Sequence, residues 1–275
     1  MSFSINTNPS ALSALRQLND TTGQLNTTQT RINTGQEVSS AKDNAAVFQI
    51  AQNLRSDLSG LKSVQGSLDR AQSTADVAIA AGEAVSDLLI QMKEKAVAAA
   101  DGGLDSTSRA ALDRDFTELR DQITTIVGEA SFNGTNAVES GGDNIIAITN
   151  DTGTNTISVA AQDLSLGGGN VTVGATDDIS TSANAATQVT NLEASISNVN
   201  SALSSLGSFS QRVELQQEFS TRLSDSIETG VGNLVDADLA KESANLQALQ
   251  TKQQLGLQAL GIANQAPQTI TSLFG

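Results

Sequence analysis

The sequence predicts a mainly α-helical protein, built as a long antiparallel coiled coil or helical bundle with a small β-hairpin insert. Three observations support this fold class. Apolar residues recur every seven positions over long stretches, which is the pattern of a coiled-coil seam. The chain has seven Phe but no Trp or Tyr, so its apolar side chains suit thin helices better than a wide globular core. One interior stretch, rich in Gly, Thr, Asn and Ser, lacks the helical period.

The longest helix is expected over residues 47–99. No proline interrupts this stretch, and Asp101-Gly102-Gly103 is the first candidate stop. Roughly fifty residues at about 1.5 Å each would make a rod on the order of 75–80 Å long, which needs partner helices along its whole length. Leucines in one heptad row are predicted to lie in the core of this rod: Leu54, Leu61, Leu68 and Leu89.

A second rod helix is expected after the Gly-containing link. One of residues 105–108 can cap its start, and the apolar residues that follow are spaced four, three, four and three apart. The link is short, which favours antiparallel packing against the long helix. The core residues predicted in this helix are Leu112, Phe116, Leu119 and Ile123.

The composition then changes, and residues 133–186 are predicted to form a short variable insert between rod helices at 45–132 and 187–230. Residues 145–149 and 156–160 flank a turn-rich stretch, which predicts a β-hairpin, and 171–173 is a candidate further strand. Residues 167–169 are three glycines and are expected to form a flexible tip. The insert as a whole is expected to be an exposed outgrowth rather than part of a core. The core residues predicted in the C-terminal rod helix are Leu192, Ile196 and Leu203.

The two ends of the chain, an N-terminal arm at 1–44 and a C-terminal arm at 231–275, each carry a thin apolar stripe on a polar surface. Such a stripe buries too little to offset the ordering entropy of the backbone, so each arm is expected to be weakly structured until it meets another subunit. Pro267 is expected to end the last helix. The predicted subunit-interface residues are Ala11, Leu15, Leu18, Leu25, Ile32, Leu239, Leu246, Leu249, Leu257 and Leu260.

The distribution of charge agrees with this interpretation of the arms. Together they carry five basic and six acidic residues, so nearly all of the net charge of −15 lies on the middle of the chain. Near-neutral ends and an acidic middle are expected if the ends are buried among subunits while the middle meets water. Chain ends are usually frayed and polar, so apolar heptads at both termini indicate packing between molecules.

No catalytic, metal-binding or cofactor-binding pattern stands out, and an enzyme is not expected. The chain has no His and no Cys, which removes the commonest general base and leading metal ligands. Carboxylate pairs such as Asp113 and Asp115 are interpreted as solvated faces, and residues 101–105 lack the alternating ligands of a calcium loop. The negative charge disfavours nucleic acid partners, and no run approaches eighteen apolar residues, so membrane insertion is not expected.

Several motifs resemble those of bacterial flagellins. Ile32-Asn33-Thr34-Gly35, followed by residues 40–46, resembles the signature after the first flagellin helix, and Phe132-Asn133-Gly134 resembles the turn before the central insert. The C-terminal end matches the flagellin pattern nearly position for position. The similarity covers residues 1–135 and 187–275. The C-terminal motifs are Asp236-Ala237-Asp238, Glu242-Ser243, Gln253-Gln254, residues 263–268 and Ser272-Leu273-Phe274.

The resemblance implies a structural subunit of the bacterial flagellar filament, whose arms are disordered in the monomer and pair as a coiled coil in the polymer. It implies further copies of the chain, other flagellin isoforms, an export chaperone and hook-junction or cap proteins as partners. A hook-junction or cap protein with the same arms is the alternative. Residues 1–9 lack the basic and apolar regions of a secretory signal, which alone favours the cytoplasm. The resemblance instead implies type III export to an extracellular filament.

One departure from the family concerns recognition by the vertebrate innate receptor. The flagellins that this receptor recognises carry Arg and Leu in the stretch that corresponds to residues 91–97. Here Gln91 replaces the Arg and Lys95 replaces the Leu. Recognition of this chain by the receptor is therefore expected to be weak or absent.

Overall fold

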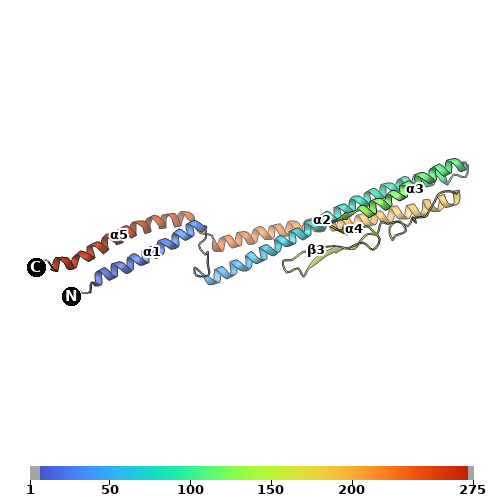
Figure 1. Ribbon diagram of the computed structural model, residues 1–275. Helices are drawn as coiled ribbons and strands as arrows, with labels where there is room; N and C mark the ends of the chain where they lie inside the picture. Colours follow the sequence, from blue (N-terminus) through green and yellow to red (C-terminus); the bar gives the residue numbers. More distant parts are fainter. Residues whose placement is uncertain (1–6, 272–275) are drawn as a thin grey trace. The chain divides into compact units, whose positions relative to one another are not determined.

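The computed structural model describes residues 7–271, and this part of the chain is mainly helical, as the heptad pattern predicts (Figure 1). The motif at residues 272–274 lies outside the described residues. The helices are α1 (Pro9–Thr34), α2 (Ala45–Ala99), α3 (Ser106–Glu129), α4 (Ser182–Val235) and α5 (Leu239–Thr271). The strands are β1 (Ser131–Phe132), β2 (Thr135–Asn136), β3 (Ile145–Ile148) and β4 (Thr156–Val159). The predicted fold class, a helical rod with a small β insert, is confirmed.

The chain divides into two compact units. The arm unit combines the N-terminal residues up to 56 with those from 226 onward, and the rod unit comprises residues 57–225. Each unit contains residues that are distant in sequence, because its helices pack antiparallel. Within the rod unit, Lys93 on α2 lies 2.9 Å from Glu193 on α4, and Lys95 lies 2.8 Å from Asp115 on α3.

The core of the rod unit is built from the heptad rows of α2, α3 and α4. The two largest side chains in it, Phe116 and Phe209, are at most 1% exposed. Alanines 71, 75, 78 and 96 continue the rows of α2, and their small size allows neighbouring helices to approach closely. Of the predicted core residues, the buried ones are Leu61, Leu68, Leu89, Phe116, Ile123 and Leu192. Those half-buried against the same core are Leu112, Leu119, Ile196 and Leu203.

Leu54 is the predicted core residue that the structure places elsewhere. It is half-buried in the arm unit, against a separate small cluster of Val38, Ala51, Val231 and Val235. The heptad row that contains Leu54 is continuous along α2, but its beginning packs in the small cluster of the arm unit and its later part packs in the core of the rod unit. The spacing of apolar residues alone does not predict where along α2 the packing partners change.

The insert is not an exposed outgrowth, and this prediction is wrong. Its apolar residues belong to the main core, and its loops are held on the rod helices by hydrogen bonds. The main-chain N–H of Ile148 donates to Ser67 Oγ on α2 over 3.1 Å, and that of Thr172 donates to Ser195 Oγ on α4 over 2.9 Å. The insert residues buried in the core are Ala137, Val138, Ile145, Ala147, Leu164, Val171, Val173 and Ile179.

The insert contains the predicted hairpin, in which β3 and β4 pair antiparallel from Ile145 with Val159 to Ile148 with Thr156. A second, smaller hairpin pairs β1 with β2 through a two-residue turn. Asn133 and Gly134 both have positive φ, of 51° and 83°, as a type I′ turn requires. Residues 171–173 form no strand beyond a single bridge from Val171 to Leu166, so the further strand predicted there is wrong.

The glycines at 167–169 form a closed turn rather than a flexible tip. The N–H of Gly167 donates to the carbonyl of Val173 over 2.8 Å, and Asp163 packs so closely that a Cβ at Gly168 would lie 2.8 Å from its carboxylate. Asp163 also accepts a short hydrogen bond from the Ser165 hydroxyl. A side chain at position 168 would therefore require the Asp163 carboxylate to move.

Three helix boundaries refine or correct the sequence-based expectations. Asp105 caps α3, because its carboxylate accepts from the N–H groups of Thr107 and Ser108 at 2.9 and 3.0 Å. α4 begins at Ser182 and continues past residue 230 to Val235. α5 passes through Pro267 to Thr271, so the predicted stop is wrong. A proline removes one main-chain hydrogen bond, and a helix can continue beyond that loss.

Candidate assembly surface

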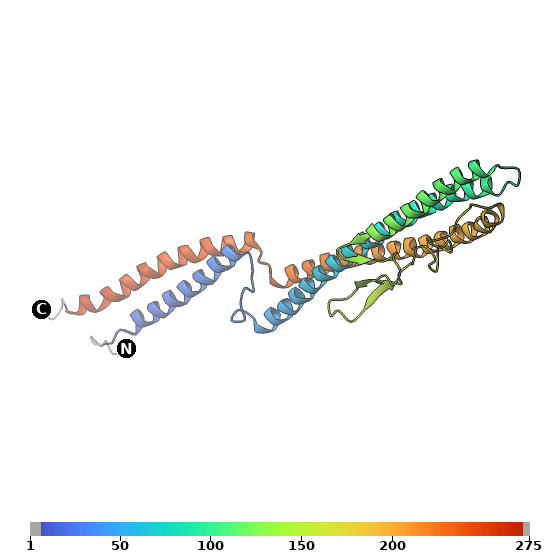
Figure 2. The same ribbon diagram turned by 45° about the vertical axis from the view of Figure 1, so that its right-hand side comes forward.

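The two arms form helices that pack against one another within one chain. α1 and α5 lie side by side in both views (Figure 1, Figure 2). Leu25 on α1 and Leu249 on α5 are each 8% exposed, and Thr21 and Thr28 are buried next to Leu25 along α1. Gly256 lies against Leu18, whose Cδ1 would be 3.3 Å from an added Cβ. The pairing of the two arm helices, which the resemblance to flagellins implies for the polymer, is thus present within one chain.

Asn8 ties the start of α1 to α5. Its side-chain oxygen accepts from the N–H of Ala11 over 3.1 Å and so caps α1, while its amide donates to the carbonyl of Ala263 over 2.7 Å. One side chain thus satisfies an unpaired N–H group at the helix start and fixes the distance between the two arm helices at this end.

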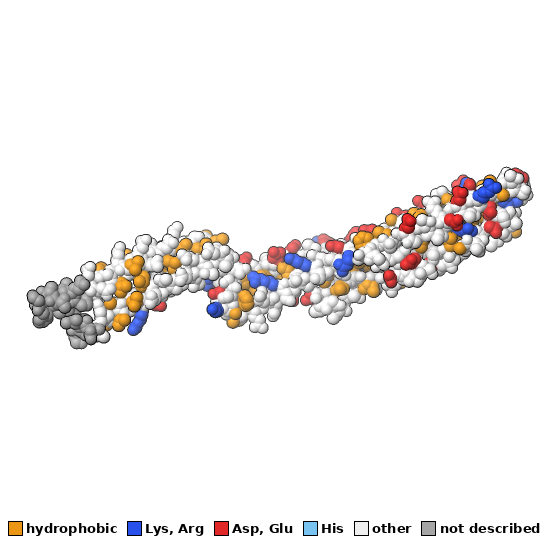
Figure 3. Space-filling view, viewed as in Figure 1, with side chains coloured by type: hydrophobic (Ala, Val, Ile, Leu, Met, Phe, Trp, Pro, Cys, Tyr) orange, Lys and Arg blue, Asp and Glu red, His pale blue; other side chains and the backbone are white. Residues whose placement is uncertain are grey.

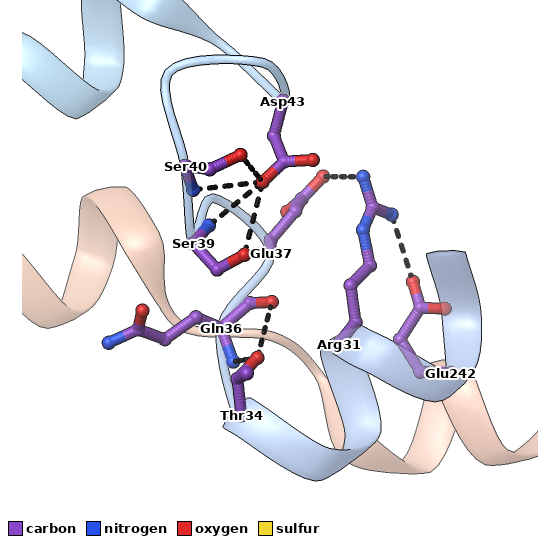
Figure 4. A network of polar contacts seen from close by, with 8 residues as sticks. All are labelled: Arg31, Thr34, Gln36, Glu37, Ser39, Ser40, Asp43 and Glu242. Carbon is purple, nitrogen blue, oxygen red and sulfur yellow. Dashed lines mark hydrogen bonds and ion pairs between the residues drawn. The ribbon is translucent and has the colours of Figure 1, made fainter. Parts of the chain in front are cut away.

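An ion pair holds the other end of the α1–α5 pair. Arg31 Nη1 lies 3.3 Å from Glu242 Oε1, and Arg31 Nη2 lies 4.0 Å from Glu37 Oε1 (Figure 4). The side chain of Glu242 is 8% exposed, so its charge is mostly removed from water and depends on Arg31 for compensation. Replacing Arg31 would leave the buried Glu242 carboxylate without this counter-charge, whereas Arg31 would keep Glu37 nearby if Glu242 were replaced.

The loop between α1 and α2 is ordered by its own hydrogen bonds. Gly35 ends α1 with a φ of 71°, and Asp43 Oδ2 accepts from both the N–H and the hydroxyl of Ser39 and of Ser40 (Figure 4). These bonds, with the Ser40 hydroxyl first, lower the pKa of Asp43 below its ordinary 3.8. Glu37 N–H also donates to the Val235 carbonyl over 2.7 Å. The flagellin-like motif at 32–46 therefore builds the junction within the arm unit.

The apolar stripe of the arms is only partly used by the α1–α5 contact. Figure 3 shows hydrophobic side chains, in orange, at the surface of the arm helices. The predicted interface residues fall into three groups. Leu25 and Leu249 are buried between the helices, and Ala11, Leu18, Ile32, Leu246 and Leu260 are half-buried. Leu15, Leu239 and Leu257 are exposed.

Among the described side chains of α1 and α5, three further large apolar residues are exposed and were not predicted. Leu12, Leu255 and Ile262 are 51%, 58% and 70% exposed. A signal for them was present, because Leu12 precedes Leu15 by three residues and Leu255 precedes Ile262 by seven. Leu12 and Leu15 also line a shallow groove that Leu260 of α5 completes. These arm residues, Leu12, Leu15, Leu239, Leu255, Leu257 and Ile262, form what we call the outer stripe.

Two further observations concern the described residues, 7–271. In this part of the chain, no three acidic or histidine side chains gather as a metal site would require. No helix among residues 7–271 combines the length and hydropathy needed to cross a bilayer.

Two family models match the chain. The model of the bacterial flagellin N-terminal helical region matches residues 5–140, and that of the C-terminal helical region matches residues 189–274. Flagellin FljM of Caulobacter vibrioides is 47% identical over 98% of both chains. A flagellin of Brucella melitensis is 35% identical over 98% of this chain and 99% of its own.

Solved structures share the fold. The crystal structure of Bacillus cereus flagellin is similar, with a TM-score of 0.50 and 26% identity, over 56% of this chain and 88% of that one. A flagellar hook-associated protein of Vibrio parahaemolyticus has a TM-score of 0.59 over 70% of this chain and all of that one. At 13% identity it shows a shared fold alone. The motifs, the two family models and the relatives of nearly equal length agree, and the chain belongs to the bacterial flagellin family, as a structural subunit of the flagellar filament.

Proposed function

We propose that the outer stripe drives polymerisation of this chain into the filament. The observation that supports this is the split of the arm leucines into an inner set, which joins α1 to α5, and an outer set that the chain's own helices leave exposed. Exposed large apolar side chains that cluster on two adjacent helices mark a protein–protein contact. The near-neutral arms fit burial among subunits better than the acidic middle does.

The size of the outer stripe is sufficient for this role. Burying a half-exposed leucine completely contributes about 1 kcal/mol, since full burial of such a side chain contributes about 1.5–3 kcal/mol. The six residues would together contribute on the order of 6 kcal/mol for each subunit added, before the cost of ordering. Loss of any one of them should therefore weaken assembly without abolishing it.

The test replaces three predicted interface residues that the structure leaves exposed, as the triple variant L15S/L239S/L257S. We expect its critical concentration for polymerisation, measured by sedimentation and electron microscopy, to rise by about a hundredfold. The control variant T27A/T30A changes exposed hydroxyls that bond only to their own helix, and should assemble normally. Ordinary filaments from the leucine variant at the normal critical concentration would refute the proposal.

The same surface supports a proposal for the chain before assembly. An exposed apolar stripe on a free subunit favours premature association, so an export chaperone that covers the arms is an expected partner. Other partners are expected to bind the outer stripe as well. These are hook-junction and cap proteins at the ends of the filament and other flagellin isoforms within it. Export then places the filament outside the cell. The measurement is the amount of the chain in culture medium with and without the flagellar export apparatus, and equal amounts would contradict this route.

Weak or absent recognition by the vertebrate innate receptor also remains a proposal. Lys95 stands where receptor-recognised flagellins have Leu, and its ammonium lies 2.8 Å from Asp115 on α3. The hydrogen bond from Lys95 to Asp115 raises the pKa of Lys95 above its ordinary 10.5, so this position remains charged. A charged, paired side chain is a poor substitute for a leucine in an apolar contact. Full-strength signalling in reporter cells would contradict this proposal.

A further inference from the structure

The turn between β1 and β2 contains the single Asn-Gly pair of the sequence, Asn133-Gly134. Both residues are exposed, and a Cβ added at Gly134 would meet nothing within 4 Å. Asparagine is a thermolabile residue, and its side-chain amide is lost most readily when glycine follows. The reason is that glycine has no side chain to shield its main-chain nitrogen, which is the atom that attacks the amide. The pair is therefore a candidate site of spontaneous deamidation.

The reaction needs only these two residues and water. The Gly134 nitrogen attacks Cγ of Asn133, so that an N–Cγ bond forms, and the Cγ–Nδ2 bond breaks as ammonia leaves with the proton of the attacking nitrogen. Water then opens the five-membered succinimide ring at either carbonyl and produces aspartate or isoaspartate. Both products have a carboxylate in place of a neutral amide. Isoaspartate also adds one methylene group to the main chain.

The folded turn holds Asn133 in a conformation from which this ring cannot close. Ring closure requires the nitrogen of the next residue to lie on the same side of the Cα–C bond as Cβ. The φ values of Asn133 and Gly134, 51° and 83°, are those of a type I′ turn. Such a turn sets ψ of its first central residue at about +30°, which in an L-residue places the next nitrogen nearly opposite Cβ. The turn must therefore open before Gly134 can react.

The β1–β2 hairpin is kept closed by Asn136, a buried residue outside the turn. Its side-chain amide donates to the carbonyl of Val127 in the last turn of α3 over 2.8 Å. Its Oδ1 accepts from the N–H groups of Val138 and Glu139 at 2.9 and 3.1 Å. Asn136 also pairs with Ser131 across the hairpin. The second strand is thus fixed to α3 and to the start of the insert, and the turn is fixed with it.

We propose that Asn133 is the asparagine of this chain that deamidates fastest in the unfolded state, and that the β1–β2 turn protects it in the folded state. Opening the turn breaks cross-strand hydrogen bonds. The folded chain should therefore react at least about tenfold more slowly than the unfolded chain, a ratio that corresponds to about 1.4 kcal/mol. The proposal concerns the chemical stability of the chain and does not depend on how the chain polymerises.

Peptide mass spectrometry of the full chain tests both parts of the proposal. The folded chain and the chain unfolded in guanidinium chloride are incubated at the same mildly alkaline pH, and every asparagine-containing peptide is followed for conversion of its amide to a carboxyl group. In the unfolded chain the peptide with Asn133 should convert first. Faster conversion at another asparagine would overturn the assignment of the site, and equal rates at Asn133 in the folded and unfolded chains would overturn the protection.

The products and one variant test the route of the reaction. The succinimide opens at two carbonyls, so the converted peptide should separate into an aspartate and an isoaspartate form of equal mass. G134A should slow conversion in the unfolded chain severalfold, because the added Cβ hinders the attacking nitrogen. A single aspartate product, or an unchanged rate in unfolded G134A, would overturn the succinimide route.

N136A tests whether the hairpin provides the protection. It removes the anchor of β2 but leaves Asn133 and Gly134 in place, so conversion in the folded chain should rise about threefold to tenfold, with the rate in guanidinium chloride unchanged. N150A is the matched control, because Asn150 ties the turn of the other hairpin through a 2.6 Å bond to Thr152. It should leave the rate at Asn133 unchanged. Equal rates in the two variants, both shown to be folded by circular dichroism, would overturn the role of the β1–β2 hairpin. The comparison of the folded and unfolded natural chain does not depend on either variant.

Discussion

The packing of the insert on the rod can be tested with two glycines of one helix. Gly60 and Gly66 both lie within α2, where replacement of glycine by alanine ordinarily stabilises a helix by about 1 kcal/mol. At Gly66 the added Cβ would meet only the end of the Arg70 side chain, at 3.8 Å. At Gly60 it would lie 2.8 Å from the Cβ of Asp151 and 3.2 Å from its Cα and carbonyl oxygen, in the turn of the β3–β4 hairpin.

The two substitutions should therefore have different effects. G66A should raise the free energy of unfolding by about 1 kcal/mol, or about 2–4 °C in midpoint for a unit of this size. In G60A the added Cβ would clash with the Cβ of Asp151 and press on its backbone atoms, and overpacking costs about 1–3 kcal/mol, so the helix gain is cancelled or reversed. The expected difference between the variants is about 1–3 kcal/mol.

Thermal and urea unfolding, followed by circular dichroism, measure both variants. The double variant G60A/D151G is a further check, because removal of the Asp151 side chain relieves only its Cβ contact and should recover part of the loss. A G60A protein as stable as G66A would refute the packing of the hairpin on α2, and would restore the idea of an insert that projects freely from the rod.

Three other outcomes are expected. L25A should lower the stability of the arm unit by about 2–3 kcal/mol, because Leu25 is buried between α1 and α5. L12A should leave the stability of the monomer unchanged and weaken assembly, because Leu12 is exposed. Equal effects of the two variants on monomer helicity would contradict the division into buried and exposed leucines. F116A should destabilise the rod unit by about 3–5 kcal/mol in chemical unfolding, because Phe116 is fully buried in its core, and a loss below 1 kcal/mol would contradict its place there. Hydrogen bonds from Ser108 lower the pKa of Asp105 below 3.8. The cap that Asp105 forms therefore stabilises α3 above about pH 4, and this stabilisation is lost as the pH falls through the lowered pKa. D105A lacks the cap at every pH, so it should show a smaller acid-induced loss of helicity than the unmodified chain.

Much of the helical architecture could be predicted because its signals are local. The heptad rows of α2 and α3 arise from 3.6 residues per turn, and each row needs only a continuous apolar face. The β3–β4 hairpin was predictable for the same reason, since alternating apolar residues flank a turn-rich stretch. The start of α3 was limited to four residues, and the structure selects Asp105 through its bonds to the first turn.

The assignments that failed depend on contacts between distant residues. Val171 and Val173 look isolated in a Gly-rich stretch, yet they are buried in the rod core, and Thr172 between them is bonded to Ser195 on α4. Leu54 belongs to a heptad row of the rod but packs against a cluster that includes Val231 and Val235, more than 170 residues away. The contact between the arms within one chain was likewise not predictable, since a thin stripe on one arm gives no indication that the other arm can cover part of it.

The sequence by itself determined that this chain has amphipathic helices and near-neutral apolar ends. It also showed that the chain has no histidine and no cysteine, on which much site chemistry depends. These properties follow directly from the composition and from the spacing of the apolar residues. The tertiary structure decided which leucines of the arms face one another and which form the outer stripe. It also decided that the insert joins the core. The physical reason is that a heptad specifies a face of a helix, whereas the partner of that face is set by packing among segments far apart in the chain.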